Sequence, residues 1–368
     1  MKKIRASMCA LVAAGLALGL PGCAVEPKAP LPVDVFMDDA FRPPSVAIDA
    51  RDALALSPAM QRFAETEMAS EIRLKGQRDG LIDALYTRGR LQLDYDAETT
   101  RTAAEAFAAK RGNCMSLVLM TAAFARHLGL PVRFNSVYLE ESWSRSNGIF
   151  FIAGHVNISL AKPLSTQAHM VFGEPELLTI DFLPPDQVRG NRSRPIEEST
   201  LLAMFLNNKA AEALMVGRVD DAYWWAREAI HTDSRWLAAY NTLAVLYRRK
   251  GLLDRAETTL RLVLERDKDL ETRVAALRTL TADPNAADLF ARFMRDKDEF
   301  KEVRQISAVG LQKLNENLFQ KVAQQIAVGA LRYRGAEIFA EPPIDHAQRE
   351  HLVILSREAA YQKDARAV

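Results

Sequence analysis

The chain has 368 residues, of which 49% are hydrophobic and 26% are charged. This composition is typical of an ordinary globular protein and excludes collagen-like and broadly disordered chains. Since 48 basic residues nearly balance 47 acidic ones, the charge gives no argument for binding to nucleic acid.

The N-terminus has the pattern of a signal peptide. Three basic residues within positions 1–5 precede an apolar run over residues 8–20. The run is shorter than the roughly 20 residues that a spanning helix needs, and it suits the hydrophobic region of a signal peptide. Residues 20–23 read Leu-Pro-Gly-Cys and resemble the lipobox of bacterial lipoproteins. We therefore predict a signal peptide over residues 1–22.

The lipobox resemblance implies that a diacylglycerol thioether on Cys23 anchors the protein in the bacterial cell envelope, facing the periplasm. Ala24, in place of aspartate after that cysteine, favours the outer membrane. The alternative is plain secretion, with Cys23 as an incidental small residue. Residues 24–45 are rich in proline, aspartate and alanine. We expect residues 23–45 to form a tether between the membrane and the first domain.

Only one of the three cysteines is expected to remain a free thiol in the mature chain. Cys9 would depart with the signal peptide and Cys23 would carry lipid, so Cys114 has no partner for an intramolecular disulfide. A lone thiol in an oxidising compartment indicates a functional role, although a buried inert cysteine is a common alternative.

Residues 46–198 have helical patterns first and strand patterns later, which is an α+β order. Helices are predicted over residues 48–88, with Ser57 as N-cap and Pro58 in the first turn, and over residues 103–110 and 115–128. Strands are predicted over residues 132–139, 149–160 and 177–182, and a polar loop containing Trp143 over 140–148.

An all-α region follows from about residue 199. Gly217, Ala222 and Ala229 recur 34 residues later as Gly251, Ala256 and Val263. The period and these positions resemble the tetratricopeptide repeat, which implies a peptide- or protein-docking region over residues 199–270. Lys209 departs from the pattern, because it occupies a place that is usually leucine.

Residues 271–368 are predicted to be helical without a third clear repeat unit. Trp224, Trp225 and Trp236 are expected to pack between the repeat helices, and a peptide groove is the alternative.

Three residues could carry chemistry. Cys114 is predicted at the start of the 115–128 helix, where unpaired N–H groups and the helix dipole favour a thiolate and could stabilise an oxyanion. Asn113 is expected to be the N-cap of that helix. His155 and Asp181 each lie on the polar face of an apolar strand. A carboxylate there needs a partner, and an imidazole N–H would provide one.

The order of cysteine, histidine and aspartate resembles the transglutaminase-like superfamily. The resemblance covers roughly residues 50–195, and its most specific parts are residues 93–96, 102–107, 111–117 and 129–132. It implies a papain-like α+β core. It also implies a Cys114–His155–Asp181 triad that attacks an amide carbonyl and forms a thioester.

Each of these residues has an alternative. Cys114 and His155 could be structural residues of the core. His169 is a rival base, whereas His127 lies ~15 Å or more along the helix from Cys114. Asp186 is a rival to Asp181, but it follows two prolines and is more typical of a turn.

The sequence therefore predicts an envelope-anchored, cysteine-dependent amide hydrolase, protease or acyltransferase. Its expected partners are a peptide or protein amide substrate, the membrane through the lipid on Cys23, and a protein at the helical repeats. No paired Cys or His spacing, acidic calcium loop or glycine-rich phosphate loop occurs, so no metal and no cofactor are expected. The alternatives are a non-catalytic peptide-binding lipoprotein and a structural spacer in an envelope assembly.

Overall fold

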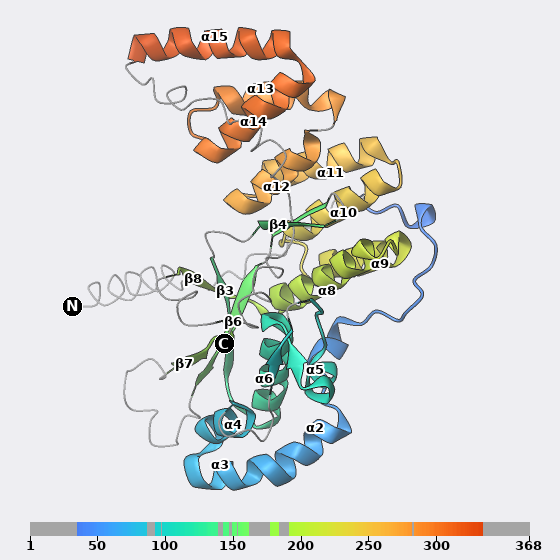
Figure 1. Ribbon diagram of the computed structural model, residues 1–368, viewed down its shortest axis with the longest axis vertical. Coiled ribbons are helices and arrows are strands. Elements are labelled where there is room, and N and C mark those ends of the chain that lie inside the picture. Colours follow the sequence, from blue (N-terminus) through green and yellow to red (C-terminus); the bar gives the residue numbers. More distant parts are fainter. Residues whose placement is uncertain are drawn as a thin grey trace, which may run out of the picture.

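The computed structural model combines a small β-sheet with a larger set of helices (Figure 1). The residues that it describes are 35–86, 93–96, 98–138, 143–146, 149–152, 154–161, 177–183, 191–281 and 283–333. The predicted signal peptide and Cys23 lie outside them. Within these ranges, no helix has both the length and the apolar character that crossing a membrane requires.

Short helices open the first part of the described chain. They are the 3-10 helices η1 (Asp38–Ala40) and η2 (Ala50–Leu54), α2 (Pro58–Phe63), the π-helix η3 (Ala64–Met68), α3 (Ala69–Lys75) and α4 (Gln77–Tyr86). The Ser57 side chain accepts a hydrogen bond from the Met60 N–H at 3.2 Å, and Pro58 occupies the first turn of α2. The predicted helix start is therefore confirmed.

Helix α6 (Cys114–His127) is the central helix of the first domain. Every residue from Met115 to Ala125 is buried, and the helix packs against α5 (Ala103–Ala109) and against the sheet. Gly129 ends the helix with a positive φ of 70°, which places the Leu130 N–H 2.9 Å from the Ala125 carbonyl oxygen. The helix predicted over residues 115–128, and its end at Gly129, are confirmed.

The sheet has four antiparallel strands in the order β7-β6-β3-β8. Three of them, β3 (Val132–Val137), β6 (His155–Ala161) and β7 (Leu177–Ile180), overlap predicted strands. The fourth, β8 (Ser193–Ile196), was not predicted, because its polar sequence Ser-Arg-Pro-Ile has no apolar periodicity.

The segment before β6 differs from the prediction. Residues expected to be a polar loop include strand β4 (Trp143–Ser146), which forms a hairpin with β5 (Ile149–Ile152). The strand predicted over residues 149–160 is therefore two strands, and Gly154 lies between them. The loop prediction was wrong because the sequence Trp-Ser-Arg-Ser of β4 has no apolar periodicity, so its pairing with β5 could not be recognised from the sequence pattern.

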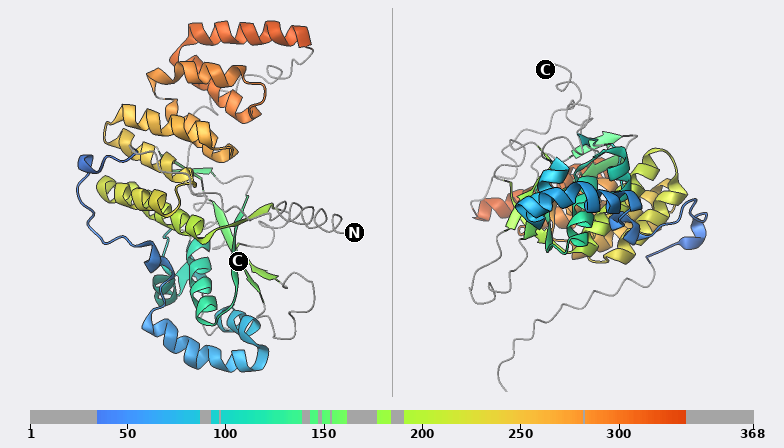
Figure 2. Two further views of the ribbon diagram at one scale, coloured as in Figure 1. Left: turned by 180° about the vertical axis from the view of Figure 1, so that it is seen from behind. Right: turned by 90° about the horizontal axis from the view of Figure 1, so that it is seen from below.

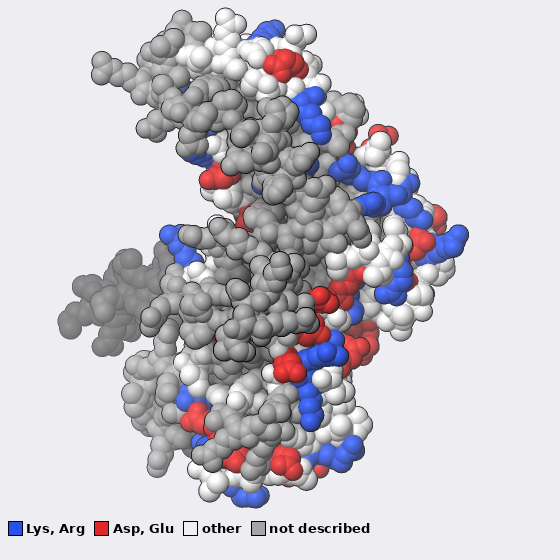
Figure 3. Space-filling model, in the orientation of Figure 1, with Lys and Arg blue, Asp and Glu red and all other residues white. Residues whose placement is uncertain are grey.

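The described residues from 198 onward form a stack of helices that extends away from the sheet (Figures 1 and 2). It contains α8 (Glu198–Met215), α9 (Val219–Thr232), α10 (Ala238–Arg249), α11 (Leu253–Arg266), α12 (Leu270–Leu280), α13 (Ala287–Arg295), α14 (Lys301–Leu314) and α15 (Glu316–Tyr333). The turns after α8 and α10 are alike, since Gly217 and Gly251 have φ angles of 78° and 79°. Positive and negative side chains are interspersed over the described part of the surface in Figure 3.

Residues 35–45, which we call the strap, pack on α9 and α10 (Figure 2). The Phe41 ring stacks on Tyr223 with 3.8 Å between ring centroids, and the Tyr247 hydroxyl donates to the Val35 carbonyl oxygen at 2.5 Å. This part of the predicted tether is therefore bound to the helices. Its prolines and aspartates resemble a linker in sequence, and its two buried apolar side chains, Val35 and Phe41, did not stand out.

Candidate active site

Cys114 is the first residue of α6 and is half-buried. Asn113 is the N-cap of the helix, as predicted. Its Oδ1 accepts hydrogen bonds from the Ser116 N–H at 2.9 Å and the Ser116 hydroxyl at 2.8 Å. The first N–H groups of a helix have no partner within it. The cap takes the N–H of Ser116, which leaves the N–H groups of Cys114 and Met115 at the open end of the helix.

A short parallel ladder leads into the helix start. Strand β1 (Asp94–Tyr95) pairs with β2 (Arg111–Gly112), which directly precedes Asn113. A Cβ atom on Gly112 would lie 2.6 Å from the Ser116 Cβ. Only glycine, which has no Cβ, therefore allows the strand to pass this close to α6. Such short strands were not predicted, because two residues show no periodicity.

His155 is the first residue of β6 and is 3% exposed. Asp181 directly follows β7, the neighbouring strand. Imidazole Nε2 of His155 lies 2.7 Å from carboxylate Oδ1 of Asp181. The Leu183 N–H donates to the same oxygen at 3.0 Å, and Asn157 Nδ2 donates to Oδ2 at 2.9 Å.

The Cys114 side chain interacts with the His155 imidazole closely enough to favour its protonated form. Because Nε2 is engaged by Asp181, the nitrogen left for the thiol is Nδ1. Burial lowers the pKa of His155, but the hydrogen bonds with Asp181 and Cys114 outweigh it and raise that pKa to about 9. Burial raises the pKa of Asp181, but hydrogen bonds from His155, Leu183 and Asn157 hold it below its ordinary value.

The structure therefore brings Cys114, His155 and Asp181 together in a row, from one helix start and two neighbouring strands. The rival residues are not part of it. His127 is exposed at the far end of α6, whereas His169 and Asp186 lie outside the described residues. Trp143 lies in β4, and its side chain is also outside the described part of the chain.

A polar network behind the three residues was missed by the sequence reasoning. Asn135 Nδ2 donates to Asn157 Oδ1 at 2.9 Å and to Ser159 Oγ at 3.0 Å, and all three side chains are buried. Ser159 in turn lies 2.8 Å from the Thr179 hydroxyl. The alternation of His155, Asn157 and Ser159 with apolar residues was visible in the sequence. This pattern placed the three side chains on one face of a strand, but it could not show which residues of the neighbouring strands they bond to.

Among the described residues, no group of three or more His, Cys, Asp or Glu side chains could hold a metal ion. The arrangement of a thiol, an imidazole and a carboxylate can instead move a proton and support nucleophilic attack by sulfur.

Residues 67–241 match a family model described as the transglutaminase-like superfamily. No curated protein and no solved structure matches the chain. The matched segment includes Cys114, His155 and Asp181, and it continues past the predicted domain end at residue 198 into α8, α9 and the start of α10. The chain therefore contains a transglutaminase-like domain at residues 67–241.

Proposed function

We propose that the transglutaminase-like domain is a cysteine-dependent amide hydrolase or acyltransferase with Cys114 as its nucleophile. The observation that carries the proposal is the position of the His155 imidazole, which is bonded to Asp181 through Nε2 and has its pKa raised by its interaction with Cys114. Asp181 fixes the orientation of the ring and stabilises its protonated form.

In the proposed reaction, His155 already holds the proton of the thiol as an imidazolium, in keeping with its raised pKa, and the thiolate sulfur of Cys114 attacks the carbonyl carbon of an amide. The N–H groups of Cys114 and Met115 face the oxyanion that forms. The imidazolium then gives its proton to the leaving amine, the C–N bond breaks and a thioester remains. Water or a second amine attacks this thioester, and the thiol is restored.

Location and substrate belong to the same proposal. A lipid on Cys23 would place the enzyme in the cell envelope, facing the periplasm, where peptide crosslinks and side-chain amides of envelope proteins are available. Helices α8 to α11 would form the tetratricopeptide-like region that docks the substrate or a protein partner. The recurrence of Gly217 and Gly251 in equivalent turns supports this part of the proposal.

Alkylation of Cys114 by iodoacetamide at about pH 5.5 tests the activated thiol. We expect the purified mature chain to react much faster than a model thiol, and His155→Ala to slow the reaction. His127→Ala is the matched control, because His127 lies exposed at the opposite end of the same helix. A rate equal to that of the model thiol would contradict the proposal. Mass spectrometry of an acyl adduct trapped on Cys114 would then identify the substrate class.

A non-catalytic peptide-binding module is the second candidate. The observation that favours it is the strap, a segment with one short 3-10 helix (Asp38–Ala40) whose backbone is bound by side chains of α9 and α10. Trp224 Nε1 donates to the Arg42 carbonyl oxygen at 2.6 Å, and Asp221 accepts from the Ser45 N–H at 2.7 Å. If Cys114 reacts like a model thiol, the binding function is favoured.

A further inference from the structure

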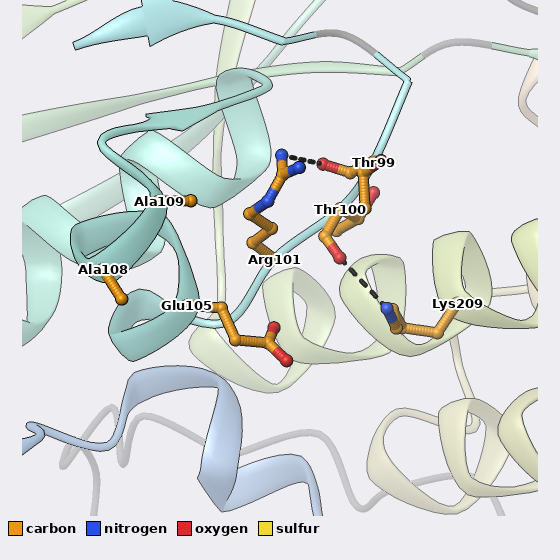
Figure 4. A pocket seen from close by; sticks show the side chains of 7 residues that line it. All are labelled: Thr99, Thr100, Arg101, Glu105, Ala108, Ala109 and Lys209. Carbon is orange, nitrogen blue, oxygen red and sulfur yellow. Dashed lines mark hydrogen bonds between the residues drawn. The ribbon is translucent and has the colours of Figure 1, made fainter.

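Helix α8 reaches the segment that precedes the catalytic domain's short helix α5. Glu212 Oε1 accepts a 2.6 Å hydrogen bond from the Thr100 N–H, and Lys209 Nζ donates to the Thr100 carbonyl oxygen at 3.1 Å. The two side chains also form an ion pair at 3.3 Å. Figure 4 shows Lys209 extending from its helix towards Thr100. Both backbone polar groups of Thr100 are therefore held by α8.

Thr100 also links α8 to the start of α6. It is 2% exposed, and its hydroxyl oxygen accepts a 2.9 Å hydrogen bond from Asn113 Nδ2. The neighbouring Arg101 N–H donates to Ser116 Oγ at 2.8 Å. Asn113 and Ser116 are the residues that form the N-cap beside Cys114.

We propose that Lys209 and Glu212 are positioning residues that act on Cys114 through Thr100 and Asn113. The carboxamide of Asn113 is held at both ends, with Nδ2 on Thr100 and Oδ1 on Ser116. If Thr100 shifts, the carboxamide turns, the cap weakens and the N–H groups beside the thiol lose their alignment. The inference rests on the proposed function, because it assumes that Cys114 is the nucleophile.

Lys209 makes polar contacts with both Thr100 and Glu212 at this point. Lys209 borders an open cavity of about 490 Å³ that is also lined by Thr99, Arg101 and residues of α5 (Figure 4). A leucine at position 209, which the repeat pattern favours, would fill space there but could not bond to Thr100. The departure of Lys209 from that pattern thus has a structural reason.

The consequence is that α8 sets the reactivity of the thiol. A partner that moves α8 would move Thr100, and the effect would reach Cys114 through two side-chain hydrogen bonds. Substrate docking on the helices and activation of the nucleophile would then be coupled.

The test is the pH profile of Cys114 alkylation by iodoacetamide, measured on the full mature chain. We expect Glu212→Leu and Lys209→Met to lower the rate about tenfold at mildly acidic pH. The rate at high pH, where any thiol is ionised, should equal that of the unmodified chain. Glu212→Gln keeps an acceptor for the Thr100 N–H and should retain the rate within about twofold.

Thr100 supplies a second, shape-preserving pair of variants. Thr100→Val removes the hydroxyl that accepts from Asn113 and should slow alkylation, whereas Thr100→Ser should not. The control is Glu198→Gln, because Arg126 and Glu198 form an ion pair between the same two helices, α6 and α8. That pair lies twelve residues, or ~18 Å, along α6 from Cys114, and its loss should leave the profile unchanged.

Each result decides one question. A reactive thiol whose profile is the same in Glu212→Leu, Lys209→Met and Thr100→Val overturns the positioning role alone. An equal loss in Glu198→Gln also overturns it, because general loosening of the two helices would then be the cause. A thiol that is unreactive in the unmodified chain contradicts the proposed function itself.

Discussion

Asn157 Nδ2 donates a 2.9 Å hydrogen bond to Oδ2 of Asp181, on the side of the carboxylate opposite His155. The two residues that hold the carboxylate are thus two positions apart on one strand, which places their side chains on the same face. Asn135 fixes Asn157 in turn through its own amide. The orientation of Asp181 is therefore set by the strand and not by His155 alone.

Asn157→Leu should raise the pKa of Asp181, because it removes one of the hydrogen bonds that hold this pKa below its usual value. The free energy of unfolding should fall by about 1–3 kcal/mol. Carbon-13 NMR titration of the carboxyl group and denaturant unfolding measure the two effects. Ser159→Ala is the control, since Ser159 lies on the same face but bonds to Asn135 and Thr179. A shift of equal size in that variant would contradict the assignment.

Protonated His155 should make the stability of the protein depend on pH. Its pKa is raised from 6.5 to about 9 in the folded chain, so folding favours the protonated ring. Protonation of His155 then contributes roughly 3 kcal/mol to the free energy of unfolding. This contribution is fully present below pH 6.5 and is lost as the pH rises through about 9. Unfolding in denaturant between pH 6 and 10 measures it. His155→Gln should lack this decline, and an identical decline in the variant would show that another group causes it.

Cys114→Ala should lower the pKa of His155. The hydrogen bond with Cys114 and its charge are two of the causes that raise this pKa, and only Asp181 would remain to oppose burial. Nitrogen-15 NMR of the imidazole follows the titration directly. If the pKa stays at about 9 in Cys114→Ala, the thiol and the ring do not interact in solution.

Much of the site could be predicted from the sequence because its signals are local. A strong apolar period, an asparagine cap and a terminating glycine define α6, so the position of Cys114 at a helix start followed directly. His155 begins a strand in which polar and apolar residues alternate, and Asp181 directly follows the next strand. Their order along the chain added the resemblance to the superfamily.

The parts that could not be predicted depend on contacts between distant residues. The bonds from Lys209 and Glu212 to Thr100 span 109 and 112 positions of the sequence. The strap bonds to Tyr223 across 186 positions. No local pattern encodes such a pairing. A lysine in a helix is expected to be solvated, and a segment with prolines is expected to be a linker.

Gly112→Ala should destabilise the start of α6. The added Cβ would lie 2.6 Å from the Ser116 Cβ, which is too short for the helix and β2 to accommodate without moving apart. We expect a loss of about 1–3 kcal/mol in the free energy of unfolding, as for other overpacked sites, together with slower alkylation of Cys114. Gly154→Ala is a fair comparison, because its Cβ would meet only the flexible end of Met204 at 3.2 Å. If the two variants are equally stable, the close approach at Gly112 is not a constraint.

The strap should owe its order to Tyr223. The Tyr223 hydroxyl accepts from the Met37 N–H at 3.0 Å and donates to Asp38 Oδ1 at 2.5 Å, while its ring stacks on Phe41. Tyr223→Phe keeps the ring and removes both hydrogen bonds. Because the charged Asp38 carboxylate loses a hydrogen bond, we expect the free energy of unfolding to fall by about 1–3 kcal/mol.

Hydrogen exchange of the peptide that covers residues 35–45 provides the measurement, with faster exchange expected in Tyr223→Phe. Tyr240→Phe is the matched control, because the Tyr240 hydroxyl is also buried in the helical stack but donates to the Ser234 carbonyl oxygen at 3.2 Å. Its loss should leave the strap protected. Protection that survives in Tyr223→Phe would mean that apolar packing of Phe41 is sufficient, and the hydroxyl would then have no part in holding the strap on α9 and α10.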